Sequence, residues 1–141
     1  MQLLTWHSTI YASRTCTMPQ NFPTLLSPTR IAGLELRNRI VMAAMGNNFA
    51  AADGHCTEQL IAYYEARAAG GVGLIVLETS AALVPNGASM PNTIAFSSDE
   101  FLPGLTELVE RVHRHGAKIV AQLNHSGNMA QEDTAAGRPI T

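Results

Sequence analysis

Three short apolar runs, separated by two segments with helical periodicity, constrain the fold of this chain more than any other feature. The runs are Ile40–Met45, Val72–Glu78 and Lys118–His125. Their equivalent positions Val41, Leu74 and Ile119 lie 33 and 45 residues apart (74 − 41 and 119 − 74). Near-continuous apolar runs are typical of parallel strands buried on both faces, and this spacing leaves room for a crossover helix. The pattern therefore predicts consecutive right-handed βαβ units.

Both intervening segments carry helix signals. Thr57–Ala69 is predicted to be helical and to end at Gly70-Gly71, with one apolar face formed by Leu60, Ile61, Tyr64 and Ala68. The second helix is expected to start with a capping box of Ser97 and Glu100. Its buried stripe is predicted to be Leu105, Leu108, Val109 and Val112. Pro103 is compatible only with the first turn of that helix.

The segment ahead of the first apolar run predicts a small hairpin. Two short runs, Thr29–Ile31 and Leu34–Leu36, flank Gly33, and such a pattern is typical of two strands joined by a turn. We expect this hairpin to form a lid across one end of the structure that follows.

Polar residues stand where each predicted strand ends. Gly46-Asn47-Asn48 follows the first run, Thr79-Ser80 the second, and Gln122 begins a polar stretch at the end of the third. The long connection Ala81–Phe96 also begins at such an end. In α/β proteins, ligands bind at the carboxyl ends of the strands, so these residues mark the expected site.

Two architectures fit this order of elements: an open doubly wound sheet and a (β/α)8 barrel. A dinucleotide-binding sheet requires G-x-G-x-x-G directly after the first strand. The turn here reads MGNNFAAADG, which contains neither that motif nor a P-loop. The sequence pattern alone leaves both architectures open.

Composition narrows the class of protein. Hydrophobic residues make up 46% of the 141 residues, and the net charge is −2 without a basic cluster, which argues against nucleic acid and membrane surfaces as partners. No apolar run approaches the roughly 20 residues of a membrane span. Cys16 and Cys56 lack the spacing of a disulfide framework or metal site. We therefore expect no metal and a cytoplasmic protein.

Residues 1–18 are expected to be an unstructured or leader-like extension, and residues 19–141 are expected to form the domain.

Four segments in order resemble one known family, the old yellow enzymes. They are Leu25–Pro28 (LLSP), Ile31–Ala43 (IAGLELRNRIVMA), Tyr63–Ile75 (YYEARAAGGVGLI) and Gln122–Gly127 (QLNHSG). Within the family, the segments are most similar to the NADH:flavin oxidoreductases of the 2,4-dienoyl-CoA reductase type. The resemblance implies an FMN-binding (β/α)8 barrel, of which this chain holds the hairpin, three strands and two helices. It also implies ene reduction, in which hydride passes from NAD(P)H through FMN to an activated C=C of a small-molecule substrate.

The resemblance assigns cofactor-binding roles residue by residue. Ala44, Met45 and Gly46 match the segment that lies against the flavin ring, and Thr79 matches a small residue near its pyrimidine edge. Gln122 matches the glutamine whose amide hydrogen-bonds that edge, where reduced flavin carries negative charge. No catalytic residue is assigned.

Other positions depart from the family pattern or receive a structural role. The resemblance leads us to expect that Asn47 substitutes for a family threonine that contacts flavin O4, and Asn128 stands where the family has an arginine. His125 matches a family histidine but is expected to be a structural loop residue. Glu78 is expected to be structural, through a cation partner or at the rim of the site. Cys56 is near a helix start, which can lower a thiol pKa, but nothing else marks it as reactive.

A complete (β/α)8 barrel takes about 250 residues. In the family, the later strands supply the phosphate site, the substrate-anchoring pair and the catalytic tyrosine. We therefore expect the 141-residue chain to be a fragment that by itself binds FMN weakly or not at all and does not turn over. The alternatives are a flavin-free barrel enzyme acting on phosphorylated substrates, and a non-catalytic protein whose open sheet edge pairs with another chain, including a second copy.

Overall fold

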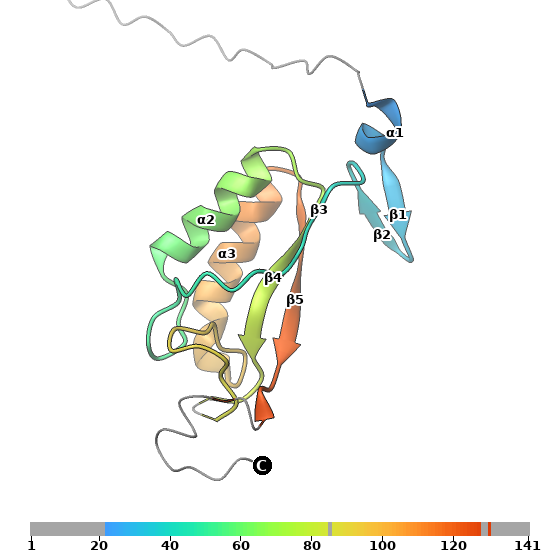
Figure 1. Ribbon diagram of the computed structural model, residues 1–141. Coiled ribbons are helices and arrows are strands. Elements are labelled where there is room, and N and C mark those ends of the chain that lie inside the picture. The colour runs from blue at the N-terminus through green and yellow to red at the C-terminus, as the bar shows by residue number, and fades with distance from the viewer. Residues whose placement is uncertain (1–21, 85, 128–129, 131–141) are drawn as a thin grey trace, which may run out of the picture.

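The computed structural model describes residues 22–84, 86–127 and 130. A short helix, α1 (Pro23–Leu26), which the sequence analysis did not anticipate, precedes the antiparallel hairpin β1 (Thr29–Ile31) and β2 (Leu34–Leu36). Both hairpin strands have the predicted bounds. The residue with positive φ in the turn is Ala32, at 50°, rather than Gly33. The hairpin lies at the end of the main sheet where β4 and β5 begin (Figure 1).

The main sheet has three parallel strands in the order β3 (Val41–Met42), β4 (Leu74–Ala81) and β5 (Lys118–Asn124). The predicted βαβ units are confirmed. The first strand is shorter than predicted, because only two residues pair with β4. Ile119 pairs with Ile75 rather than Leu74, so the predicted equivalence of the third strand was wrong by one residue.

Two helices cover one face of this sheet (Figure 1): α2 (Glu58–Ala69) and α3 (Leu102–Arg114). Thr57 is the N-cap of α2, and its hydroxyl accepts a hydrogen bond from the Leu60 amide at 3.1 Å. The predicted capping box of α3 was wrong, since the helix is preceded by a 3₁₀ turn, η1 (Asp99–Phe101), with Ser98 at its N-cap. Pro103 does lie in the first turn of α3.

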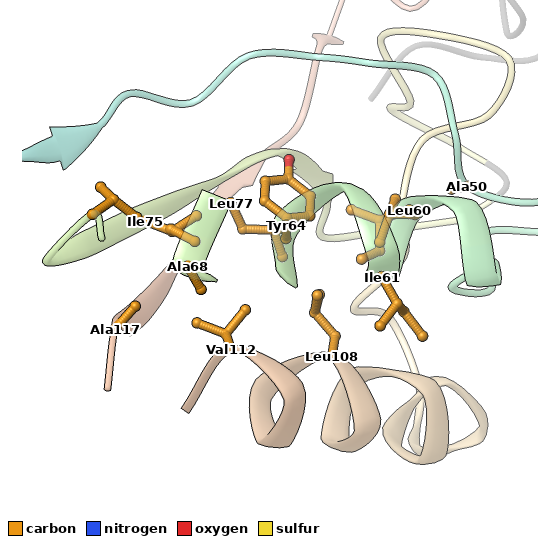
Figure 2. Packing of buried hydrophobic residues seen from close by; sticks show 12 residues of the cluster. Ala50, Leu60, Ile61, Tyr64, Ala68, Ile75, Leu77, Leu108, Val112 and Ala117 are labelled. Atoms are coloured by element: carbon orange, nitrogen blue, oxygen red, sulfur yellow. The ribbon is translucent and has the colours of Figure 1, made fainter. Parts of the chain in front are cut away.

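The core lies between the two helices and the sheet. All four predicted residues of α2 are buried, whereas in α3 only Leu108 and Val112 are buried and Leu105 and Val109 are partly exposed. Figure 2 shows how side chains from α2, α3 and β4 converge on this core. No helix in the part of the chain that the structure describes is both long enough and apolar enough to cross a membrane.

The two outer strands differ from the central one in burial. Six of the eight residues of β4 are buried and none is exposed, as expected of a strand in the middle of a parallel sheet. In β5, Val120 is 42% exposed and Leu123 is 63% exposed. Among the described residues, β5 pairs with β4 alone, so the sheet has an open edge along β5.

Candidate functional site

The candidate site is built around an irregularity in β4. Leu77 pairs with Ala121 and Thr79 pairs with Gln122, so Glu78 is an extra residue in the β4–β5 ladder. Such a bulge changes the face on which the following side chains lie. Ile75 and Leu77 face the helices, and without the bulge Thr79 would lie on their face. With it, Thr79 lies on the opposite face, beside Gln122.

Thr79 and Gln122 are in direct contact. The Thr79 hydroxyl donates a hydrogen bond to Gln122 Oε1 at 3.3 Å. This contact leaves the Gln122 Nε2 group without a partner among the described residues. Thr79 is partly exposed and Gln122 is exposed, so both are accessible from the face of the sheet that the helices do not cover.

This arrangement suits the pyrimidine edge of a flavin. Because Thr79 engages the acceptor oxygen of the Gln122 amide, the two N–H donors of that amide remain for a ligand. Flavin N1 and O2 are acceptors, and donors that lie in position before a reaction stabilise negative charge that develops there. The residues present therefore fit the flavin that the family resemblance implies.

The segment after β3 completes the candidate site. Ala44 is partly exposed, Met45 is 52% exposed and Gly46 is exposed. These residues lie beyond the end of β3 and form no ladder, contrary to the predicted strand Ile40–Met45. An added Cβ at Gly46 would be 2.5 Å from the Met90 Cε atom, so a side chain there requires the flexible end of Met90 to move.

Glu78 holds the same segment from the other side. Its side chain is fully buried, and Oε2 accepts a hydrogen bond of 2.6 Å from the backbone amide of Asn47. Oε1 is buried and has no partner among the described residues. Burial raises the pKa of this carboxyl above its ordinary value, while hydrogen bonds from the Asn47 and Asn48 amides oppose the shift. Among the described residues, the partners of this carboxylate are therefore backbone amides rather than a cation.

The sequence analysis missed the residues that join the loops after β3 and β4. The backbone amide of Asn92 donates to Asn48 Oδ1 at 3.0 Å, and Asn48 has a φ of 60°. Asparagine tolerates this left-handed conformation better than most residues do. The sequence analysis treated the pair Asn47-Asn48 as a loop signal and Asn47 as a candidate flavin contact, and nothing local connects the pair with Asn92.

His125 has contacts consistent with a structural role. Its Nδ1 atom accepts a hydrogen bond from the Gly127 amide at 3.1 Å. Its ring packs against Gly87, where an added Cβ would be 2.7 Å from the ring atoms. The Ser126 amide also donates to the Gly87 carbonyl. The loop after β4 therefore contacts the loop after β5 as well. Asn128 lies outside the described residues.

Cys56 is not an activated thiol. Burial, together with the negative charges of Glu107 and Glu78, raises its pKa to about 11. Its position before α2 therefore does not lower the pKa. Among the described residues, no group of three or more His, Cys, Asp and Glu side chains is arranged to hold a metal ion.

Comparison with known proteins identifies the family. Residues 24–139 match the NADH:flavin oxidoreductase / NADH oxidase family. The NADH oxidase of Thermoanaerobacter brockii is 43% identical over 117 residues, which are 83% of this chain and 18% of that protein. The NADPH dehydrogenase of Halalkalibacterium halodurans is 44% identical over 110 residues, 77% of this chain and 32% of that protein.

Comparison with solved structures supports the same family assignment. The old yellow enzyme from Trypanosoma cruzi superposes with a TM-score of 0.73 at 32% identity, over 85% of this chain and 32% of that one. The chain thus spans about a fifth to a third of the length of these relatives. Because the structural relatives are barrels, the (β/α)8 alternative is confirmed over the doubly wound sheet. The finer assignment to the 2,4-dienoyl-CoA reductase branch stays a prediction. The chain belongs to the NADH:flavin oxidoreductase / NADH oxidase family, and its sheet and helices form part of an old-yellow-enzyme-type barrel.

Proposed function

We propose that this chain supplies the flavin-ring side of an FMN-dependent ene-reductase site. FMN, when bound, supplies hydride transfer between NADH or NADPH and an activated C=C of a small substrate. The observation that carries the proposal is the Thr79–Gln122 pair, which presents an oriented amide at the carboxyl ends of parallel strands. The family match favours this function over a flavin-free barrel enzyme.

Each residue of the site has a distinct task in this proposal. Gln122 donates to the pyrimidine edge of the flavin, and Thr79 fixes the orientation of that amide through its own hydroxyl. Ala44, Met45 and Gly46 form the surface on which the ring lies, and their small or flexible side chains let the ring approach the backbone. No residue of the described chain is assigned a proton-transfer role.

The remaining parts of the proposal concern partners and setting. The substrate class is an electron-poor alkene, because hydride addition requires an activated double bond. One structural neighbour was solved with 2-naphthoyl-CoA, a conjugated thioester of that general kind. We further propose that the protein is cytoplasmic, that it forms a homo-oligomer, and that NADH or NADPH is the reductant.

A chimeric barrel tests this proposal. Residues 22–127 replace the corresponding segment of the Halalkalibacterium halodurans NADPH dehydrogenase, and the purified chimera is examined for bound flavin by its visible absorbance. We expect bound FMN and NADPH-dependent reduction of 2-cyclohexen-1-one. The matched control is the same chimera with Gln122→Leu, which keeps the volume of the side chain and removes the amide. It should retain its fold and bind flavin roughly 10-fold or more weakly.

The outcome that contradicts the proposal is equally specific. A folded chimera that contains no flavin, or a Gln122→Leu chimera whose flavin affinity and absorbance spectrum are unchanged, would show that this chain does not form the pyrimidine side of the site. The parental dehydrogenase, purified in parallel, gives the reference flavin content.

A further inference from the structure

Glu78 is the only carboxylate among the fully buried side chains of the described chain, and neither the family resemblance nor the proposed function gives it a task. A buried carboxylate is costly unless hydrogen bonds compensate it. Here the compensation comes from the backbone of a different element, the loop after β3.

The bulge explains how this side chain reaches that loop. Glu78 is the extra residue of the β4–β5 ladder, and its own amide donates to the Tyr64 hydroxyl at 3.1 Å. The carboxylate is therefore anchored through β4 and α2, two of the most buried elements of the chain. Bulges are common where a side chain must be redirected next to a functional site.

The loop that is hydrogen-bonded to Glu78 also carries the candidate flavin surface, Ala44–Gly46. Asn47, whose amide it accepts at 2.6 Å, directly follows Gly46. A Cβ at Gly46 would itself be 3.9 Å from Glu78 Oε2. The loop is tied on its other side by the hydrogen bond between Asn48 and Asn92. Since β3 contributes only two ladder residues, these contacts replace strand pairing in fixing the loop.

We propose that Glu78 is a positioning residue, whose carboxylate holds the loop after β3 so that Ala44–Gly46 can face the flavin. The role of Glu78 in flavin binding rests on the proposed function. The hydrogen bond from the Asn47 amide to Glu78 is a property of the chain itself. The two are therefore tested by separate measurements on the same 141-residue protein.

Amide hydrogen exchange, measured residue by residue by NMR, tests whether the hydrogen bond to Glu78 holds the loop. Glu78→Met fills a similar volume without an acceptor, and Glu78→Gln retains an acceptor oxygen without the charge. We expect the Asn47 amide to exchange about 10- to 100-fold faster in Glu78→Met, the loss typical of a hydrogen bond to a charged group. Glu78→Gln should restore most of the protection. The control Ser80→Ala removes the bond from Ser80 Oγ to the Glu78 carbonyl, 2.7 Å long, and should leave Asn47 unchanged.

A titration of the unmodified protein keeps the inference testable if a variant does not fold. The Asn47 amide resonance should move with a single midpoint above the ordinary carboxyl range, because burial raises the Glu78 pKa. The other titratable groups that face Glu78 are Cys56 and Tyr64, and the pKa of each is raised above its ordinary value. Neither titrates in that window. Equal protection of Asn47 in Glu78→Met and Glu78→Gln, or an Asn47 resonance insensitive to pH, would overturn the inference.

Flavin is then added to the same labelled proteins at millimolar FMN. If the Gly46 amide and the Gln122 side-chain amide shift saturably, and the shifts weaken several-fold in Glu78→Met but not in Ser80→Ala, Glu78 positions the flavin surface. If flavin shifts are equal in both variants, the positioning role is refuted. If FMN moves no resonance in the unmodified chain, FMN affinity is compared in the chimeric barrel instead. There, equal affinity of the Glu78→Met and Ser80→Ala chimeras refutes the positioning role, and a folded chimera without flavin refutes the proposed function. The exchange result still decides whether Glu78 holds the loop.

Discussion

We expect removal of the Arg37 side chain to lower the free energy of unfolding through a specific set of hydrogen bonds. Arg37 lies just after β2, and its guanidinium donates to three carbonyls: Ala68 at 2.7 Å, Val72 at 2.9 and 3.2 Å, and His115. These carbonyls stand at the end of α2, ahead of β4, and at the C-cap of α3. The last carbonyls of a helix lack partners within the helix, and a cation is favourable there.

The expected loss of unfolding free energy follows from the number of carbonyls that Arg37→Met leaves without a partner. Hydrogen bonds to charged groups contribute about 1.5–3 kcal/mol each. Arg37 is partly exposed, so water can replace part of each lost bond. We therefore take about 1 kcal/mol for each carbonyl and expect Arg37→Met to lower the free energy of unfolding by about 3 kcal/mol. Arg37→Lys should recover only part of this, because one ammonium cannot span three carbonyls.

Urea unfolding followed by circular dichroism is the assay, with linear extrapolation to water. The matched control is Arg39→Met, which changes the same residue type two positions along the chain. Arg39 is exposed, and among the described residues its side chain donates only to Ser27 Oγ, at 3.2 Å. Its replacement should therefore cost no more than about 0.5 kcal/mol. If Arg37→Met is unfolded without urea, the comparison is made with Arg37→Lys. A loss for Arg37→Met within 0.5 kcal/mol of the control would refute the reasoning.

Three further predictions follow from local features. Thr57→Val removes the N-cap hydroxyl of α2 and should lower the free energy of unfolding by about 1–2 kcal/mol in the same urea assay; an unchanged midpoint would contradict the cap. In a Cys16→Ser background, Cys56 should react with iodoacetamide roughly 100-fold more slowly at pH 7.5 than in the urea-unfolded chain, since its pKa is raised from 9.0 to about 11, and the rate should rise steadily up to about pH 11; a plateau near pH 9 would show an ordinary thiol. Leu123→Lys places a charge on the open β5 edge and should reduce any self-association seen by size-exclusion chromatography with light scattering, whereas oligomers that persist unchanged would exclude that edge as the contact.

The sequence alone was enough to predict the elements that have a local signal. The hairpin Thr29–Ile31 and Leu34–Leu36 and the apolar face of α2 have their predicted positions. The same holds for the order of three parallel strands. Each depends on side-chain periodicity and turn residues within about a dozen positions, which is the range over which a sequence pattern can be interpreted. The polar residues Thr79 and Gln122 at the strand ends do lie together, and their binding role stays a prediction.

Errors arose where pairing between distant segments decides the outcome. The first strand was predicted to extend to Met45, but its pairing ends at Met42. The predicted cap of α3 was Ser97, whereas its N-cap is Phe101 and a 3₁₀ turn precedes it. Side-chain preference does not reveal where a ladder stops, because that depends on the partner strand and its register.

What the sequence by itself determined is the family, the parallel α/β architecture and the end of the sheet that carries the polar residues. Only the tertiary structure decided that β4 contains a bulge at Glu78, that this carboxylate grips the Asn47 amide, and that Arg37 joins the ends of two helices. The physical reason is that these features depend on register and on contacts across 31 to 78 residues. No local pattern encodes such contacts, and they form only when the elements are packed together.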